Sequence, residues 1–143
     1  MVVRRAFLAA ALVFITVVPA SAEVRILSSP GGEVGTYLKF FSILRESGQR
    51  IIIDGPCLSA CTLVLSAIPR DQICVTSRAV LGFHAPRLVD EDGSESAAAE
   101  ATRLMAATYP APVRAWIRRH GGLTSKTIFL SGRQLAALYP HCS

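Results

Sequence analysis

Gly55-Pro56-Cys57-Leu58-Ser59-Ala60-Cys61 is the stretch around which this chain is organised. It ends one apolar run, residues 51–53, and opens another, residues 62–65. The first run is short and β-branched, which is typical of a buried strand, whereas the second is bounded by Pro69 and indicates a buried helix. The sequence therefore predicts that Ser59 lies at a strand-to-helix elbow.

A serine at such an elbow has two interpretations. The free N–H groups and the dipole of a helix N-terminus favour a developing negative charge, which is what the nucleophile and oxyanion of acyl transfer require. Serine is also a preferred N-cap residue, and capped helices are far more common than nucleophile elbows. The elbow by itself therefore leaves both a catalytic and a purely structural Ser59 open.

The first 22 residues have the pattern of a secretory signal peptide. Arg4 and Arg5 precede an apolar stretch over residues 6–18, and Ala20-Ser21-Ala22 supplies small residues for cleavage. This apolar stretch is shorter than the roughly 20 residues that span a bilayer, so a permanent membrane anchor is not expected. We expect export to the periplasm or the exterior, and one domain over residues 23–143.

The charge of the expected mature chain says little about partners. Ten acidic residues and thirteen of the fifteen Lys and Arg residues follow Ala22, which leaves a slight basic excess. The only local concentration of basic residues is Arg114, Arg118 and Arg119, whose spacing fits one solvated helical face. Because an exported protein seldom meets nucleic acid, no nucleic-acid partner is expected.

The mature chain contains four cysteines, Cys57, Cys61, Cys74 and Cys142. An even number in a small exported domain predicts disulfides, with three possible pairings. A metal site is not expected, because Cys57 and Cys61 have no second close pair and the three histidines are scattered. No cofactor motif is present, so no cofactor is expected. A bridge between Cys57 and Cys61 would close around Ser59 and stiffen the elbow.

The segments before the elbow, together with the helix expected after it, predict two βα units. A strand is expected over residues 24–27, an amphipathic helix over residues 34–47 and a buried strand over residues 50–54. Strands covered on both faces are typical of parallel sheets, in which ligands bind beyond the carboxyl ends of the strands. Both Ser59 and the turn at Gly31-Gly32 follow such ends, so we expect them on one edge of the sheet.

The segments after the elbow complete an α/β fold. Short strands are expected near residues 73–75 and over residues 79–83, the second ending at His84. That histidine would lie on the edge that carries Ser59, and imidazole is the usual general base for a serine. An exposed mobile loop is expected over residues 90–95, followed by helices over residues 97–107, 113–119 and 132–138. The predicted fold has repeated βα units, a mostly parallel sheet and C-terminal helices.

The order and spacing of several short motifs carry a family likeness. Ser29-Pro30-Gly31-Gly32 precedes a helix and an apolar strand, Gly55 lies four residues before Ser59, and His84 follows that serine by 25 residues. The tail adds the segments Phe129-Leu130-Ser131 and Gln134-Leu135-Ala136 and then Tyr139. From about Arg25 to Tyr139, the chain resembles the proteolytic subunit of the Clp protease, a member of the Clp/crotonase superfamily.

This resemblance implies a role for four residues. Ser59 matches the nucleophile and His84 the general base, while Gly32 and Ala60 match the two backbone N–H donors of an oxyanion hole. It also implies a peptide or protein as substrate and a homo-oligomer as a possible assembly. The same family has a third triad member, an aspartate, whose position corresponds to Thr127 in this chain.

The missing aspartate leaves three possibilities. No acidic residue follows Glu100, so a substitute would come from the acidic loop, at Asp90 or Asp92. Alternatively Ser59 and His84 act as a dyad, or catalysis has been lost.

The resemblance also bears on the disulfides. In the Clp fold the closing segment runs beside the strand that holds Cys74, which favours a Cys74–Cys142 bridge and leaves Cys57 to pair with Cys61. The alternative pairing, Cys61 with Cys74 and Cys57 with Cys142, stays open at the level of sequence.

Three functions are consistent with these features. The leading hypothesis is an exported Clp-like serine hydrolase, a peptidase that acts through an acyl-enzyme. The alternative is a catalytically inactive exported binding module that keeps the fold. A third, acyl-CoA chemistry of the crotonase type, is disfavoured because CoA substrates are intracellular.

Overall fold

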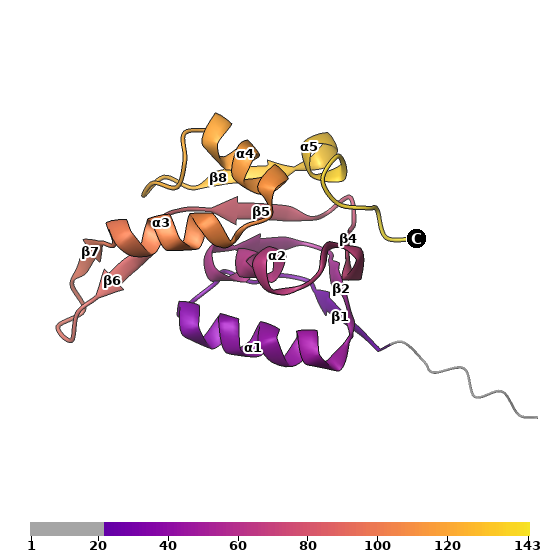
Figure 1. Cartoon of the computed structure of the whole chain (residues 1–143), viewed down its shortest axis with the longest axis horizontal. Coiled ribbons are helices and arrows are strands. Elements are labelled where there is room, and N and C mark those ends of the chain that lie inside the picture. Colours follow the sequence, from indigo (N-terminus) through magenta and orange to yellow (C-terminus); the bar gives the residue numbers. More distant parts are fainter. Residues whose placement is uncertain (1–21) are drawn as a thin grey trace, which may run out of the picture.

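The computed structural model describes residues 22–143, which form a mixed α/β structure with small parallel and mixed sheets and five α-helices (Figure 1). The signal peptide expected over residues 1–22 lies, apart from Ala22, outside the described residues. Within residues 22–143, no helix has both the length and the apolar character needed to cross a membrane.

The first sheet is parallel and has the strand order β1-β2-β4, with β1 over Glu23–Ile26, β2 over Arg50–Ile53 and β4 over Ile73–Val75. Helix α1 (Val34–Ser47) connects β1 to β2 and has the predicted bounds. It buries Phe41 and Leu44, and Gly48 ends it in the left-handed conformation. The first βα unit and the strand β2 that follows it therefore form as the sequence predicted.

The chain then crosses to a second sheet, which corrects the expectation of one mostly parallel sheet. This sheet has the order β3-β5-β8, with β3 over Pro56–Leu58, β5 over Val80–Phe83 and β8 over Ile128–Ser131. The pair β3–β5 is parallel, whereas β5–β8 is antiparallel. A Cβ atom at Gly55, where the chain crosses, would lie 1.9 Å from the Leu27 carbonyl oxygen, so only glycine permits this crossing.

The strand that leads into the elbow is β3, not the 50–54 strand that the apolar run predicted. Strand β2 ends at Ile53, and Pro56 takes the first position of β3, where a strand tolerates a missing N–H group. The helix predicted after the elbow begins as a 3₁₀ turn, η1 (Ser59–Leu63), and continues as α2 (Val64–Ala67). A second 3₁₀ turn, η2 (Arg70–Gln72), follows Pro69.

The loop expected over residues 90–95 is the tip of a β-hairpin that projects from the body of the molecule (Figure 1). Strands β6 (Arg87–Val89) and β7 (Glu95–Ala97) form it, and an ion pair joins Arg87 to Glu95 across the two strands. Its strands are only three residues long and exposed on both faces, so they lack the apolar alternation that predicts a half-buried strand.

The C-terminal helices lie where they were expected, with shifted ends. They are α3 (Ala99–Thr108), α4 (Ala111–Arg119) and α5 (Gly132–Ala136). In Figure 1, α4 and α5 lie beside β8, on the side of the molecule opposite α1. The buried Trp116 and Ile117 of α4 join the core, together with Tyr109 from the turn between α3 and α4.

Two disulfides join Cys57 to Cys61 and Cys74 to Cys142. This is the pairing that the resemblance favoured, and it excludes the alternative between Cys61 and Cys74. Only the last residues of the chain run beside β4, where the Cys142 N–H donates to the Val75 carbonyl at 3.0 Å. The two bridges are consistent with an oxidising compartment such as the periplasm or the exterior.

Candidate active site

Ser59 follows β3 directly and occupies the first position of η1. Among residues 22–143 it is the only residue other than glycine with a positive φ, 55°. Such a conformation costs a non-glycine residue about 1–2 kcal/mol, and strain of this kind is concentrated at functional sites. The N-cap position is Leu58, whose side chain makes no capping bond, so Ser59 is not the simple N-cap that the structural interpretation assumed.

The turn at Gly31-Gly32 packs directly against the elbow. A Cβ atom at Gly31 would lie 2.6 Å from the Ser59 Cβ and 2.9 Å from the Ala60 nitrogen. The preceding Ser29 extends the sheet beyond β3, because its N–H donates to the Pro56 carbonyl at 2.8 Å and its carbonyl accepts from the Leu58 N–H at 2.9 Å. The glycine turn and the elbow are therefore held against each other through their backbones.

A buried hydrogen-bond chain supports Ser59 from the other side. The Thr62 hydroxyl donates to the Ser59 carbonyl at 2.7 Å, so the Tyr109 hydroxyl, 2.7 Å from Thr62 Oγ1, is the donor in the second bond. Burial raises the pKa of Tyr109 to about 12, which keeps this phenol protonated as a donor. Tyr109 thus ties the turn between α3 and α4 to the elbow.

The two expected oxyanion donors, Gly32 and Ala60, lie on these adjoining segments. Ala60 is buried directly after Ser59, and the Gly31 backbone approaches its nitrogen closely. Gly32 is exposed, and its N–H donates to no other backbone group between residues 22 and 143. A pair of backbone N–H groups on neighbouring segments is the usual composition of an oxyanion hole.

His84 follows β5, the parallel neighbour of β3. The register pairs Leu58 with Gly82, so Ser59 and His84 both leave the second sheet at the carboxyl end of adjacent strands. This is the common edge that the sequence predicted for them. The His84 Nδ1–H donates to the Ala85 carbonyl at 2.7 Å, which leaves Nε2 as the basic nitrogen of the neutral ring.

The position where the resemblance expects an aspartate, Thr127, lies directly before β8 and beside β5. The β5–β8 register ends where Phe83 pairs with Ile128, and the Ala85 N–H then donates to the Thr124 carbonyl at 2.7 Å, two residues out of that register. The Thr127 methyl group would lie 3.3 Å from a Cβ atom at Gly82, on the face of β5 that also carries His84. The chain therefore has a threonine, and not a carboxylate, beside the strand that ends before His84.

The acidic residues proposed as substitutes are bound elsewhere. Asp92 accepts from the Ser94 N–H at 2.9 Å, and Asp90 accepts from the Ser94 hydroxyl at 3.2 Å, both within the tip of the β6–β7 hairpin. The bond from the Ser94 N–H is the main cause that lowers the pKa of Asp92. Both carboxylates bond within the hairpin turn, and the hydrogen-bond partner of His84 is the Ala85 carbonyl, so this structure does not show the replacement by Asp90 or Asp92 that the sequence left open.

The one buried carboxylate of the described residues, Asp54, is bonded to residues other than His84. It accepts from Thr76 Oγ1 at 2.7 Å, from Arg25 at 2.9 Å and from Arg78 at 2.5 Å. These three partners hold the pKa of Asp54 far below its usual range. Its place at the end of β2, beside the crossing at Gly55, indicates that it stabilises the passage from one sheet to the other.

The supporting residues of the site were not found in the sequence. Tyr37 was assigned only to the apolar face of a helix, and nothing connects Thr62 to Tyr109, which lies 47 residues later. Within residues 22–143, no cluster of three or more His, Cys, Asp or Glu residues could hold a metal ion. No protein-family model matches this chain, and no curated protein is significantly similar to it.

Proposed function

We propose that this protein is an exported serine hydrolase with a Clp/crotonase-like fold, and that it cleaves peptides through an acyl-enzyme. The observation that carries the proposal is the left-handed backbone of Ser59, which packs against the glycine turn. Ser59 follows the carboxyl end of β3, and His84 follows the carboxyl end of β5, the strand that pairs with β3. A helix cap needs neither the strained backbone nor the neighbouring histidine. Two disulfides and the expected signal peptide support a periplasmic or secreted location.

In the proposed reaction, Ser59 Oγ attacks the acyl carbon of the substrate while His84 Nε2 takes its proton. The N–H groups of Gly32 and Ala60 stabilise the negative charge that develops on the acyl oxygen. His84 then returns the proton to the leaving amine, and a water molecule, activated by the same nitrogen, releases the acyl group from Ser59.

The bond to the Ala85 carbonyl supplies part of what an aspartate would supply. It holds the histidine in the tautomer whose Nε2 accepts a proton, but a neutral carbonyl stabilises the imidazolium less than a carboxylate does. The proposed enzyme is therefore a dyad with a slower rate than a full triad. The same observation favours the second candidate, a binding module that retains the fold without catalysis.

Labelling with a fluorophosphonate probe distinguishes the serine hydrolase from the binding module. The oxidised protein over residues 23–143 is compared with Ser59→Ala and His84→Ala, and circular dichroism verifies that each variant is folded. We expect covalent labelling of the unsubstituted protein and none of Ser59→Ala. His84→Ala should lose most of the rate. Absence of labelling in a folded, oxidised sample would establish the binding module instead.

A further inference from the structure

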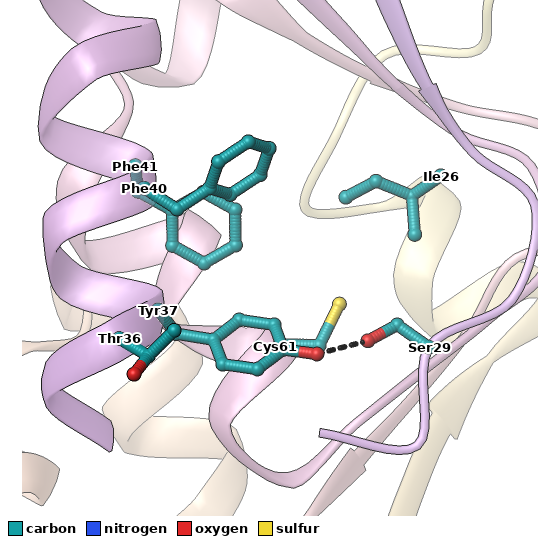
Figure 2. Close-up of a pocket in the computed structure, with 7 residues that line it drawn as sticks. All are labelled: Ile26, Ser29, Thr36, Tyr37, Phe40, Phe41 and Cys61. Atoms are coloured by element: carbon teal, nitrogen blue, oxygen red, sulfur yellow. Dashed lines mark hydrogen bonds between the residues drawn. The ribbon is translucent and has the colours of Figure 1, made fainter. Parts of the chain in front are cut away.

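Two pockets of similar volume differ in the chemistry of their walls. One, of about 380 Å³, lies between α1 and the elbow, and none of its side chains carries a charge (Figure 2). The polar pair at one end of it is already satisfied, because Ser29 Oγ and the Tyr37 hydroxyl share a 2.7 Å hydrogen bond. The other pocket, of about 450 Å³, lies between η2 and the last turn of the chain. This C-terminal pocket is lined by Arg70, Asp71, Ala136, Tyr139 and Pro140.

The two walls of the C-terminal pocket are fixed to each other. Arg70 Nε donates to the Leu138 carbonyl at 2.7 Å, which joins η2 to the segment after α5. The disulfide between Cys74 and Cys142 joins the strand after η2 to the end of the chain. A ligand therefore does not have to order this pocket before it binds. The volume also lies within the range of small-ligand sites, which is roughly 300–1,000 Å³.

The Tyr139 hydroxyl is a donor that the protein itself does not use. Tyr139 is 2% exposed and lines the pocket, yet its hydroxyl takes part in none of the hydrogen bonds found among residues 22–143. The similarly buried Tyr109 hydroxyl, by contrast, bonds to Thr62. Burial raises the pKa of Tyr139 to about 12, so its phenol stays protonated at neutral pH. Because an unpaired buried hydroxyl is costly, one that lines a pocket indicates an acceptor that enters the pocket.

Arg70 and Asp71 bring opposite charges to the wall of this pocket. In the part of the chain that the structure describes, the ion pairs involve other side chains. The guanidinium of Arg70 lies over the Tyr139 ring, 5.9 Å from its centroid, so the two donors are neighbours. Together they match the two oxygens of a carboxylate. The Asp71 carboxylate would repel a simple anion and attract a cationic group.

We infer that the C-terminal pocket binds a free α-amino acid with an apolar side chain, as the zwitterion. Arg70 and the Tyr139 hydroxyl bind its carboxylate, and Asp71 binds its ammonium group. Ala136 and Pro140 provide the surface for its side chain. Both charges line one pocket, so the two ligand groups must lie close together, as they do on the single carbon of an α-amino acid. No lining residue belongs to the proposed hydrolase site, so this inference goes beyond that function and does not rest on it.

The test compares three ligands that share one side chain. L-Leucine carries both charged groups, L-leucinamide lacks the carboxylate and isocaproate lacks the ammonium group. Each is titrated into the oxidised, ¹⁵N-labelled protein over residues 23–143, and the backbone amide shifts of Asp71, Gln72 and Ala136 are followed by NMR. Four of the five lining residues are exposed, so we expect leucine to bind with a millimolar dissociation constant. The other two ligands should bind about tenfold more weakly or less. Absence of saturable shifts with leucine, or equal affinities for the three ligands, would overturn the inference.

Two substitutions locate the binding. Tyr139→Phe removes only the hydroxyl and should weaken leucine binding by about tenfold. The free energy of unfolding without ligand should not fall, because that hydroxyl has no partner in the protein. Arg70→Gln should weaken binding at least as much. Arg133→Gln removes the same charge from an exposed position of α5 outside the pocket and should leave the affinity within about twofold. Leucine binding that neither pocket variant weakens would overturn the inference.

Asp71→Asn gives a result that a purely structural role of Asp71 would not give. The substitution keeps the size of the side chain and removes its charge at an exposed position. Leucine binding should weaken by about fivefold, whereas isocaproate binding should strengthen, because the repulsion of its carboxylate is removed. If both affinities fall together, Asp71 does not contact the ammonium group and the assignment of a zwitterion is wrong.

Discussion

The Gly31 backbone lies so close to Ser59 that a Cβ atom at position 31 would approach the Ser59 Cβ to 2.6 Å. No side chain fits between the turn and the elbow, and φ at Gly31 is 84°, so the position requires glycine twice over. The glycine turn and the candidate nucleophile therefore form one rigid unit.

Gly31→Ala should push the glycine turn away from Ser59. We expect a loss of about 3 kcal/mol in the free energy of unfolding, from a left-handed alanine and from an overpacked contact, together with loss of fluorophosphonate labelling. Gly48→Ala is the matched control, because Gly48 also has a positive φ, 66°, but nothing lies within 4 Å of its Cβ position. It should cost only about 1 kcal/mol and retain labelling. Urea unfolding and probe labelling measure both effects, and equal losses for the two variants would contradict the prediction.

Removal of one disulfide should mainly lower stability, and removal of the other should mainly lower activity. Cys74 and Cys142 are 68 residues apart, so replacing both by alanine should cost about 4 kcal/mol in the chain-entropy model, whereas the short Cys57–Cys61 loop should cost about 2 kcal/mol. Fluorophosphonate labelling should show the opposite order, so that loss of the Cys57–Cys61 bridge reduces it more than loss of the Cys74–Cys142 bridge. The reason is that only the short bridge brackets Ser59. Thermal unfolding and the labelling rate at a temperature where both variants are folded provide the measurement. A labelling loss that simply follows stability would contradict a role of the short bridge in positioning Ser59.

Local signals in the sequence predicted the elements of the first sheet well. Helix α1 has the predicted bounds because its apolar residues recur at helical spacing and Gly48 provides an unambiguous end. The second sheet was missed because β3 has three residues and begins with Pro56, a pair of features that indicates a turn. What directs the chain into this sheet is the contact between Leu27 and Gly55, and no local pattern encodes a contact across 28 residues.

For the candidate site, too, the sequence predicted some features and not others. The sequence predicted Ser59, His84 and the glycine turn as site residues because each follows a strand, and the structure places Ser59 and His84 after the adjacent parallel strands β3 and β5. The bond from His84 to the Ala85 carbonyl depends on the direction of one peptide group after β5, and the Tyr109–Thr62 bond depends on how α3 packs. Both bonds depend on the tertiary structure, so the hydrophobic periodicity of the sequence does not predict them.

Asp54 should make the protein sensitive to acid. Its pKa is lowered in the folded state by Thr76, Arg25 and Arg78, so its ionised form stabilises the fold above the unfolded pKa of about 3.9. This stabilisation is lost progressively as the pH falls below that value toward the folded pKa. Asp54→Asn should therefore lower stability at pH 6 and flatten the dependence of stability on pH between about 2 and 5. Urea unfolding across this pH range tests the prediction, and parallel curves for the two proteins would contradict it.

A carboxylate at position 127 should convert the proposed dyad into a triad. Because Thr127 packs against β5 at Gly82, two residues before His84, Thr127→Asp should bring an acceptor toward His84 and stabilise the imidazolium that forms when Ser59 attacks. We expect the labelling rate to rise by about tenfold or more, since a triad carboxylate contributes up to about 10⁴. Ser125→Asp adds the same charge two residues away, at an exposed position, and should leave the rate within about twofold. Equal rates for the two variants would mean that the Ala85 carbonyl keeps His84 away from position 127. A labelling rate that rises in Thr127→Asp but not in Ser125→Asp would show that the missing carboxylate limits the reactivity of Ser59.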